Sequence, residues 1–131
     1  MATLSTAARN AMCDALVDLF DIGTANPGAT LEVLHSNGTT VLVAFELAAT
    51  SFGSAGASNA GEAVLASTPY TETASETGTA TTARIKNRDG TVVVSGLTVG
   101  TSGTQVVVSS TSVTSGQTIN LNSGTITMPA S

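Results

Sequence analysis

The spacing of apolar residues changes once along the chain, from a helical period to an extended one. Over residues 5–21, apolar side chains recur three or four positions apart, which predicts one amphipathic α-helix at the N-terminal end. Its apolar stripe comprises Ala8, Met12, Leu16 and Leu19, with Cys13, Val17 and Phe20 beside it. The pattern leaves open whether the helix packs on the protein's own sheet or on a neighbouring molecule.

Both ends of this helix carry the expected signals. Ser5 or Thr6 can cap its start, and Gly23 and Pro27 supply a stop shortly after its last apolar position. Three aspartates lie off the stripe, and we interpret them as a solvated face: Asp14, Asp18 and Asp21.

Residues 30–47 give the most secure local prediction, which is a β-hairpin. Two strands, 30–35 and 40–47, flank the turn sequence Ser36-Asn37-Gly38. Asn-Gly between two apolar runs is typical of the tight turn that joins antiparallel strands. A loop of small residues follows over residues 50–61, and a loop of that length in a small domain is often functional.

Short strands separated by turn residues account for the rest of the chain. Residues 62–67 form a strand that ends before Pro69, and residues 70–78 form a polar connection. Further strands are predicted at 79–86, 91–97, 105–110, 117–122 and 125–128. The turns between them lie at 87–90, 100–103, 115–116 and Ser123-Gly124. The valine runs at 92–94 and 106–108 indicate strands covered on both faces.

These elements predict an all-β fold, a two-sheet antiparallel β-sandwich of about eight strands preceded by one N-terminal helix. The periodicity does not distinguish a jelly-roll from an immunoglobulin-like topology. A length of 131 residues favours a single domain over 1–131, with the helix at 5–21, the sandwich at 30–128 and a C-terminal tail at 129–131.

Composition narrows the possible function classes. Charged residues make up 10% of the chain, whereas it contains 15 Ser and 23 Thr, so hydroxyl groups rather than charges solvate the surface. A formal net charge of −5 offers no broad basic footprint for nucleic acid. The longest apolar run, at residues 41–45, falls far short of the roughly 18 residues of a membrane span. The N-terminus lacks the basic and apolar regions of a secretory signal.

The chain contains few residues of the types that catalyse reactions. The chain has one His, one Cys and no Trp, which leaves little for a zinc site, a disulfide framework or a Cys–His pair. His35 ends a predicted strand, and Ser36 would point to the opposite face of an extended chain, which disfavours a triad. Cys13 lies beside the apolar stripe, as a small buried hydrophobe would. We therefore expect no enzyme, no cofactor, no metal and no small-molecule substrate.

Five residues are candidates for contact with another protein. Arg84, Lys86 and Arg88 form a basic cluster, which is either an edge strand whose charges prevent aggregation or a contact for an acidic partner. Phe52 and Tyr70 are the aromatic residues least tied to a periodic apolar face. Each is either an exposed interface anchor or a plug at the end of a lean sandwich.

Several stretches resemble small virion proteins of tailed bacteriophages: Leu4–Met12 with Asp18–Asp21, Ala83–Gly96 with Val99–Gly103, and Gly116–Thr118 with Ser123–Pro129. Within that group the chain is similar to the capsid cement, or decoration, proteins. The resemblance implies a jelly-roll-like protein that sits outside the major capsid lattice and clamps neighbouring subunits. It implies no catalytic residues.

From this resemblance we expect a virion structural protein on the capsid exterior, made in the host cytoplasm. Its expected partners are the major capsid protein and further copies of itself, with no direct contact to nucleic acid or membrane. The joining contacts are expected from the N-terminal segment, the 51–61 loop and the tail at 127–131. Two alternatives stay open. One is a phage tail or fibre component, and the other is a carbohydrate-binding sandwich, although such modules usually expose Trp or Tyr and this chain has only Tyr70.

Overall fold

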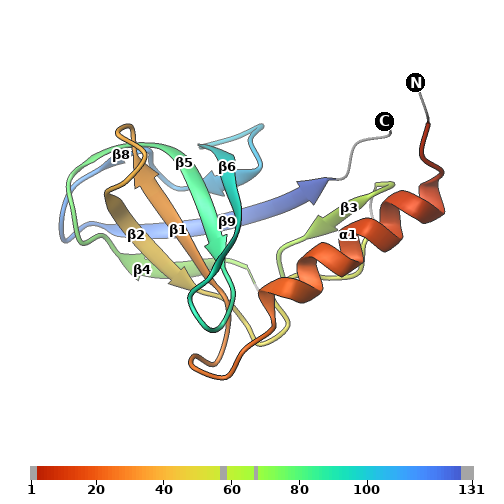
Figure 1. Cartoon of the computed structure of the whole chain (residues 1–131). Coiled ribbons are helices and arrows are strands. Elements are labelled where there is room, and N and C mark those ends of the chain that lie inside the picture. The colour runs from red at the N-terminus through yellow and green to blue at the C-terminus, as the bar shows by residue number, and fades with distance from the viewer. Residues whose placement is uncertain (1–2, 57–58, 67, 128–131) are drawn as a thin grey trace.

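The computed structural model describes residues 3–56, 59–66 and 68–127. Within these ranges the chain forms one helix, α1 (Thr6–Phe20), followed by nine strands. They are β1 (Thr30–His35), β2 (Val41–Glu46), β3 (Glu62–Val64), β4 (Tyr70–Thr73), β5 (Gly78–Lys86), β6 (Val92–Gly100), β7 (Val106–Val108), β8 (Ser112–Val113) and β9 (Thr118–Thr127). The prediction of a mostly β fold with one N-terminal helix is confirmed. Figure 1 shows α1 at one side of a curled sheet, next to β3.

The helix begins and ends within one residue of its predicted bounds. Ser5 is the N-cap, and its hydroxyl accepts a hydrogen bond from the Ala8 amide at 3.1 Å. This bond satisfies one of the amides that the first helical turn leaves without a carbonyl partner.

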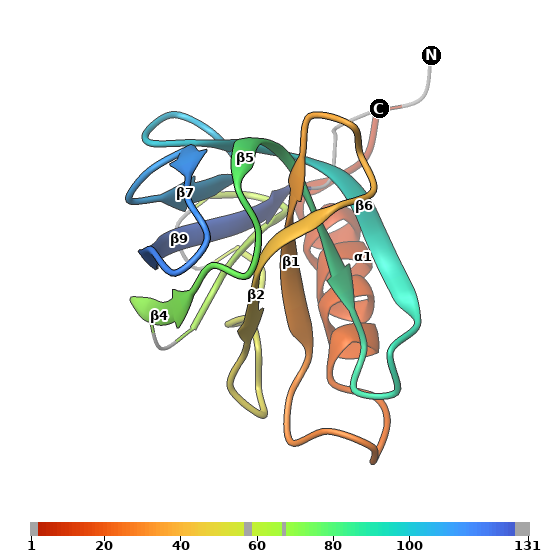
Figure 2. The ribbon, with the colours of Figure 1, turned by 90° about the vertical axis from the view of Figure 1, so that its left-hand side faces the viewer.

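The strands form one continuous, curled sheet in the order β2-β1-β5-β6-β7-β9-β3, while β4 pairs with β9 and β8 with β5. The ladder does not divide clearly into the two separate sheets of the predicted sandwich. Nor is it antiparallel throughout, because β6 and β7 pair in parallel, with Val99 opposite Val106. Figure 2 shows the curl from the side of β2, β1 and β5.

The parallel pair arises because the chain turns through a full loop between β6 and β7. Side chains hold the two ends of this loop together. The Gln105 side-chain oxygen accepts from the Thr98 amide, and the Thr98 hydroxyl accepts from the Gln105 amide, both at 3.1 Å. The turn predicted at 100–103 is therefore present, but it does not reverse the strand direction as a hairpin turn does.

The two hairpin turns with strong local signals are confirmed. In the β1–β2 turn, the Asn37 side-chain oxygen accepts from the Thr39 and Thr40 amides at 2.9 and 3.0 Å. In the β5–β6 turn, the Asn87 oxygen accepts from two amides in the same way, each at 3.0 Å. Each turn also has a glycine at positive φ, which only glycine adopts readily.

The predicted turn at Ser123-Gly124 is wrong. Residues 118–127 are one strand, β9, and Gly124 lies within it. A Cβ at Gly124 would stand 3.3 Å from a methyl carbon of Leu65, so the glycine allows close packing rather than a turn. The polar connection predicted at 70–78 also contains a strand, because β4 pairs with the first part of β9.

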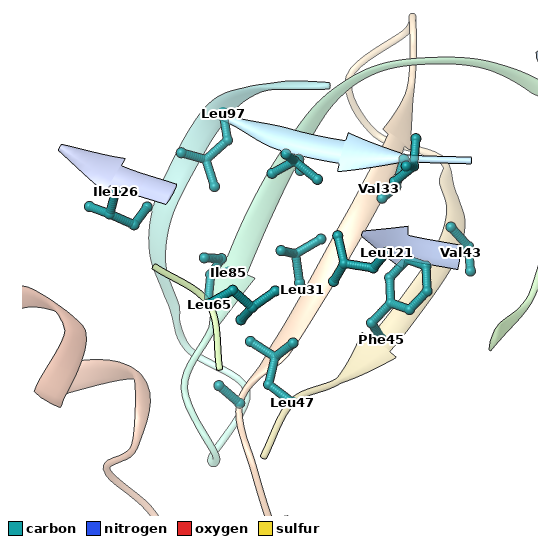
Figure 3. Close-up of a cluster of buried hydrophobic side chains, with 14 of the residues drawn as sticks. Leu31, Val33, Val43, Phe45, Leu47, Leu65, Ile85, Leu97, Leu121 and Ile126 are labelled. Atoms are coloured by element: carbon teal, nitrogen blue, oxygen red, sulfur yellow. The ribbon is translucent and has the colours of Figure 1, made fainter. Parts of the chain in front are cut away.

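The curl encloses one apolar core. Figure 3 shows side chains from β1, β2, β5 and β6 in the same space as those from β9: Leu31, Val33, Val43, Phe45, Ile85, Leu97, Leu121 and Ile126. The backbone closes the curl where the Ser75 amide, just after β4, donates to the Leu42 carbonyl at 2.9 Å. The valine run of β7 is largely buried, but Val92 in β6 is 43% exposed, so the prediction that both runs are covered on both faces is wrong for β6.

We predict that Gly28→Ala destabilises the protein by about 2–3 kcal/mol. A Cβ at this buried position would overlap the Leu47 carbonyl oxygen, and backbone must move to relieve the overlap. Urea denaturation measures the change. The control is Gly53→Ala, where the nearest atom to the new Cβ is the Val64 carbonyl oxygen at 3.8 Å. Equal stability of the two variants would contradict the prediction.

Candidate functional site

The predicted basic cluster is divided between two places in the fold. Arg84 and Lys86 lie on β5 and both contact one carboxylate, Glu32 of β1. The Arg84 Nε donates to Glu32 Oε1 at 2.6 Å, and the Lys86 Nζ lies 3.3 Å from the same oxygen. Because β5 lies between β1 and β6, the interpretation of this segment as a charged edge strand is wrong. These two cations are partly neutralised and half-buried.

Arg88 fastens the β5–β6 turn to the segment that follows α1. Its Nε donates to the Asn26 carbonyl at 2.8 Å, and the Asn26 side-chain amide donates to the Arg88 carbonyl at 2.9 Å. The Arg88 amide also donates to the Ile22 carbonyl at 3.0 Å. The side chain of Arg88 is thus held within the fold and does not join Arg84 and Lys86 in one patch.

The two aromatic candidates, Phe52 and Tyr70, pack within the fold. Phe52 is only 4% exposed, and its ring centroid lies 5.4 Å from that of Phe20, so its interpretation as an exposed anchor is wrong. Tyr70 is half-buried. Its hydroxyl donates to the Ala66 carbonyl at 2.7 Å and accepts from the Ala48 amide at 3.0 Å.

His35 and Cys13 both make hydrogen bonds within the fold. The His35 Nδ1 accepts from the Asn37 amide at 3.1 Å within the β1–β2 turn. The chain leaves the strand here, so the Ser36 hydroxyl comes within 3.1 Å of the same nitrogen and does not point to the opposite face as predicted. Cys13 is fully buried, its thiol donates to the Ile126 carbonyl at 3.4 Å, and burial raises the pKa of the thiol.

Polar side chains of α1 and of its C-cap residue, Asp21, hold the loop that follows β2. Three of them accept hydrogen bonds from its backbone: Asn10 from Gly61 at 2.7 Å, Asp14 from Ala55 at 2.7 Å and Asp21 from Ser51 at 3.0 Å. The interpretation of the aspartates as a solvated face is therefore wrong for Asp14 and Asp21, whereas Asp18 is exposed. Residues 57 and 58 of the 51–61 loop lie outside the described residues, as do residues 128–131 of the predicted tail.

The helix has two apolar faces, and only one of them packs on the sheet. Cys13, Val17 and Phe20 form the buried face. We define the outer face of α1 as five exposed residues on the other side of the helix and in the turn that follows it: Ala11, Met12, Ala15, Leu19 and Ile22. The large members are 45%, 45% and 52% exposed for Met12, Leu19 and Ile22. This face contains part of the stripe predicted from the sequence.

A pocket of about 300 Å³ lies between α1 and the loop after β2. Its lining residues are Asp14, Val17, Asp18, Thr50, Phe52, Gly53 and Ser54. Val17 and Phe52 are buried and supply an apolar base, while Asp18 is exposed and Asp14 half-buried. We refer to it as the α1 pocket.

The outer face of α1 and the α1 pocket are the strongest candidate site. Phe52 and the 51–61 loop, which line the pocket, were predicted contacts, whereas Met12, Leu19 and Ile22 of the outer face were not among the five candidate residues. The sequence does contain a sign of the outer face, because apolar residues occupy more than one side of the helix. A helix that packs on one sheet needs only one apolar side. Within the described residues, no group of three or more His, Cys, Asp or Glu side chains is placed to hold a metal ion. No described helix is long and apolar enough to cross a membrane.

Comparisons with known proteins found no matching family model, no matching curated protein and no matching solved structure.

We predict that Asp14→Ala destabilises the protein by about 1–2 kcal/mol, because the Ala55 amide loses its acceptor in a partly buried position. Asp14→Asn keeps an acceptor oxygen and is expected to lose less. Urea denaturation measures the stability, and Asp18→Ala on the exposed side is the control. A larger effect at Asp18 than at Asp14 would refute the assignment of Asp14 as a loop anchor.

We predict a pH-dependent contribution from Asp89, whose carboxylate accepts from the Thr24 and Ala25 amides at 3.0 and 3.2 Å. These bonds lower the pKa of Asp89 below its usual value of 3.8. A lowered carboxyl pKa stabilises the folded state above that value, and the contribution is lost as pH falls through the folded-state pKa. Asp89→Ala is therefore expected to be less stable than the wild type near pH 7. The gap should narrow as the pH falls below 3.8 and through the lowered pKa of the folded state. Glu72→Gln, which removes an exposed carboxylate in β4, is the control. A gap that is independent of pH would contradict the expected role.

Proposed function

We propose that this protein is a capsid cement protein of a tailed bacteriophage, which binds outside the major capsid lattice and bridges neighbouring subunits. The proposal joins the resemblance of the sequence to that group with one structural observation, the exposed outer face of α1. Apolar side chains gathered on one exposed surface are typical of contact sites with other proteins.

The scaffold supports this role because it presents α1 in a fixed position. The buried face of the helix packs on the sheet, and two polar side chains of the helix and that of its C-cap accept hydrogen bonds from the backbone of the loop after β2. A contact surface held by a packed core loses little freedom when it binds, which favours affinity. A copy that bridges two capsid subunits is also held more firmly than by either contact alone, because its first contact raises the effective concentration for the second.

We propose further that the curled sheet is a variant of the jelly-roll-like sandwich. Its two halves, β2-β1-β5-β6 on one side and β7-β9 with β3 and β4 on the other, contribute side chains to one core. In this proposal the protein acts without catalysis on the virion exterior after synthesis in the host cytoplasm, and it is a homo-oligomer on the particle.

The test is binding to empty capsids assembled from the cognate major capsid protein. We expect purified protein to co-sediment in proportion to the number of capsid subunits and to raise the temperature at which the capsids disassemble. A few copies per particle at one vertex would instead indicate a tail component. Absence of binding, or binding without stabilisation, would refute the cement function.

A further inference from the structure

We infer that the outer face of α1 and the α1 pocket together dock a segment of the capsid subunit that carries apolar side chains and at least one Lys or Arg. This inference rests on the proposed function for the identity of the partner. It adds the location of the contact and the chemistry of the partner segment.

The outer face of α1 has no packing partner among the described residues of the fold. Met12, Leu19 and Ile22 are each about half exposed, although the helix already buries Cys13, Val17 and Phe20 on its other side. A helix that is apolar on both sides is normally covered on both sides. In Figure 1, α1 lies at the margin of the molecule beside β3.

The α1 pocket combines apolar and acidic side chains. Its base is apolar, from Val17 and Phe52, and it carries the two carboxylates of Asp14 and Asp18. One Asp14 oxygen already accepts from the Ala55 amide, and a carboxylate has further acceptor positions. Lys and Arg combine a long apolar stem with a cationic end, and this combination matches an apolar base beside carboxylates.

The outer face and the α1 pocket are continuous. Asp18 lines the pocket, and on the helix surface it lies beside Ala15 of the outer face, which is three positions away. A single bound segment can therefore place apolar side chains on the outer face and a cationic side chain in the pocket.

Charge favours a basic segment over a second copy of this chain. The proposed docking surface carries two carboxylates, Asp14 and Asp18, both in the α1 pocket, and the chain as a whole has a formal net charge of −5. Pairing α1 with α1 of another copy would gather carboxylates at one interface, where like charges destabilise the complex. A segment with Lys or Arg removes this penalty and gains from the pairing.

The experiment measures binding of the full-length protein to assembled capsids for two pairs of variants. Leu19→Gln is compared with Val92→Gln, since both side chains are apolar and similarly exposed, at 45% and 43%, but Val92 lies on β6. Asp18→Asn is compared with Glu72→Gln, since both remove one exposed carboxylate but Glu72 lies on β4. Circular dichroism and urea denaturation confirm that each variant folds.

We expect Leu19→Gln to weaken binding about tenfold and Asp18→Asn to weaken it severalfold with a reduced dependence on salt. The two controls should bind as the wild type does. A photo-crosslinker at position 12 should attach to a capsid peptide that contains Lys or Arg.

Other outcomes separate the two proposals. If the wild type binds capsids and the α1 variants bind equally well, the docking surface is wrong and the cement function stands. If the wild type does not bind, the cement function fails, and the docking proposal fails with it. If Leu19→Gln converts a stable dimer to a monomer without changing capsid binding, the outer face joins two copies of this chain and the inference is overturned.

Discussion

The fold depends on β9, because this strand holds the far end of the curled sheet and the helix together. β9 pairs with β7, β4 and β3, and its side chains Ile119, Leu121 and Ile126 are buried in the common core. The carbonyl of Ile126 accepts from the Cys13 thiol, so the same strand contacts α1. The curled sheet encloses these side chains in one core. The ten residues of β9 span that curl.

The hydrogen-bonding needs of the loop after β2 determine where the helix carries its aspartates. Loop amides that lose contact with water require acceptors, and Asp14 and Asp21 provide them for the loop after β2. These carboxylates therefore stand on the side of α1 that faces the loop. The opposite side keeps its apolar residues and only Asp18 at the border. The exposed apolar surface is thus set by the same contacts that position the helix.

Features that depend on a few neighbouring residues could be predicted from the sequence, and features that depend on distant ones could not. The turns at Asn37 and Asn87 are held by hydrogen bonds that span at most four residues. The dipeptides Asn-Gly and Asp-Gly were therefore sufficient to predict them. Gly124 has the same local appearance, but its environment is Leu65 from a different strand. β4 lacks an alternating apolar pattern and is recognisable only by its pairing with β9. The parallel pairing of β6 with β7 likewise needs the side chains of Thr98 and Gln105.

The candidate site was misjudged because sequence shows which groups are present but not which are already paired. The basic cluster suggested an acidic partner, yet Arg84 and Lys86 share Glu32, and Arg88 bonds a backbone carbonyl. Aromatic residues suggested anchors, yet Phe52 lies against Phe20. Exposed carboxylates remain at Asp18, Glu46, Glu72 and Glu76. Because the basic side chains are paired within the fold, the expected partner surface is basic rather than acidic. A partner recognised by charge is attracted to groups that are accessible, and on this protein the accessible charge beside the apolar helix face is acidic.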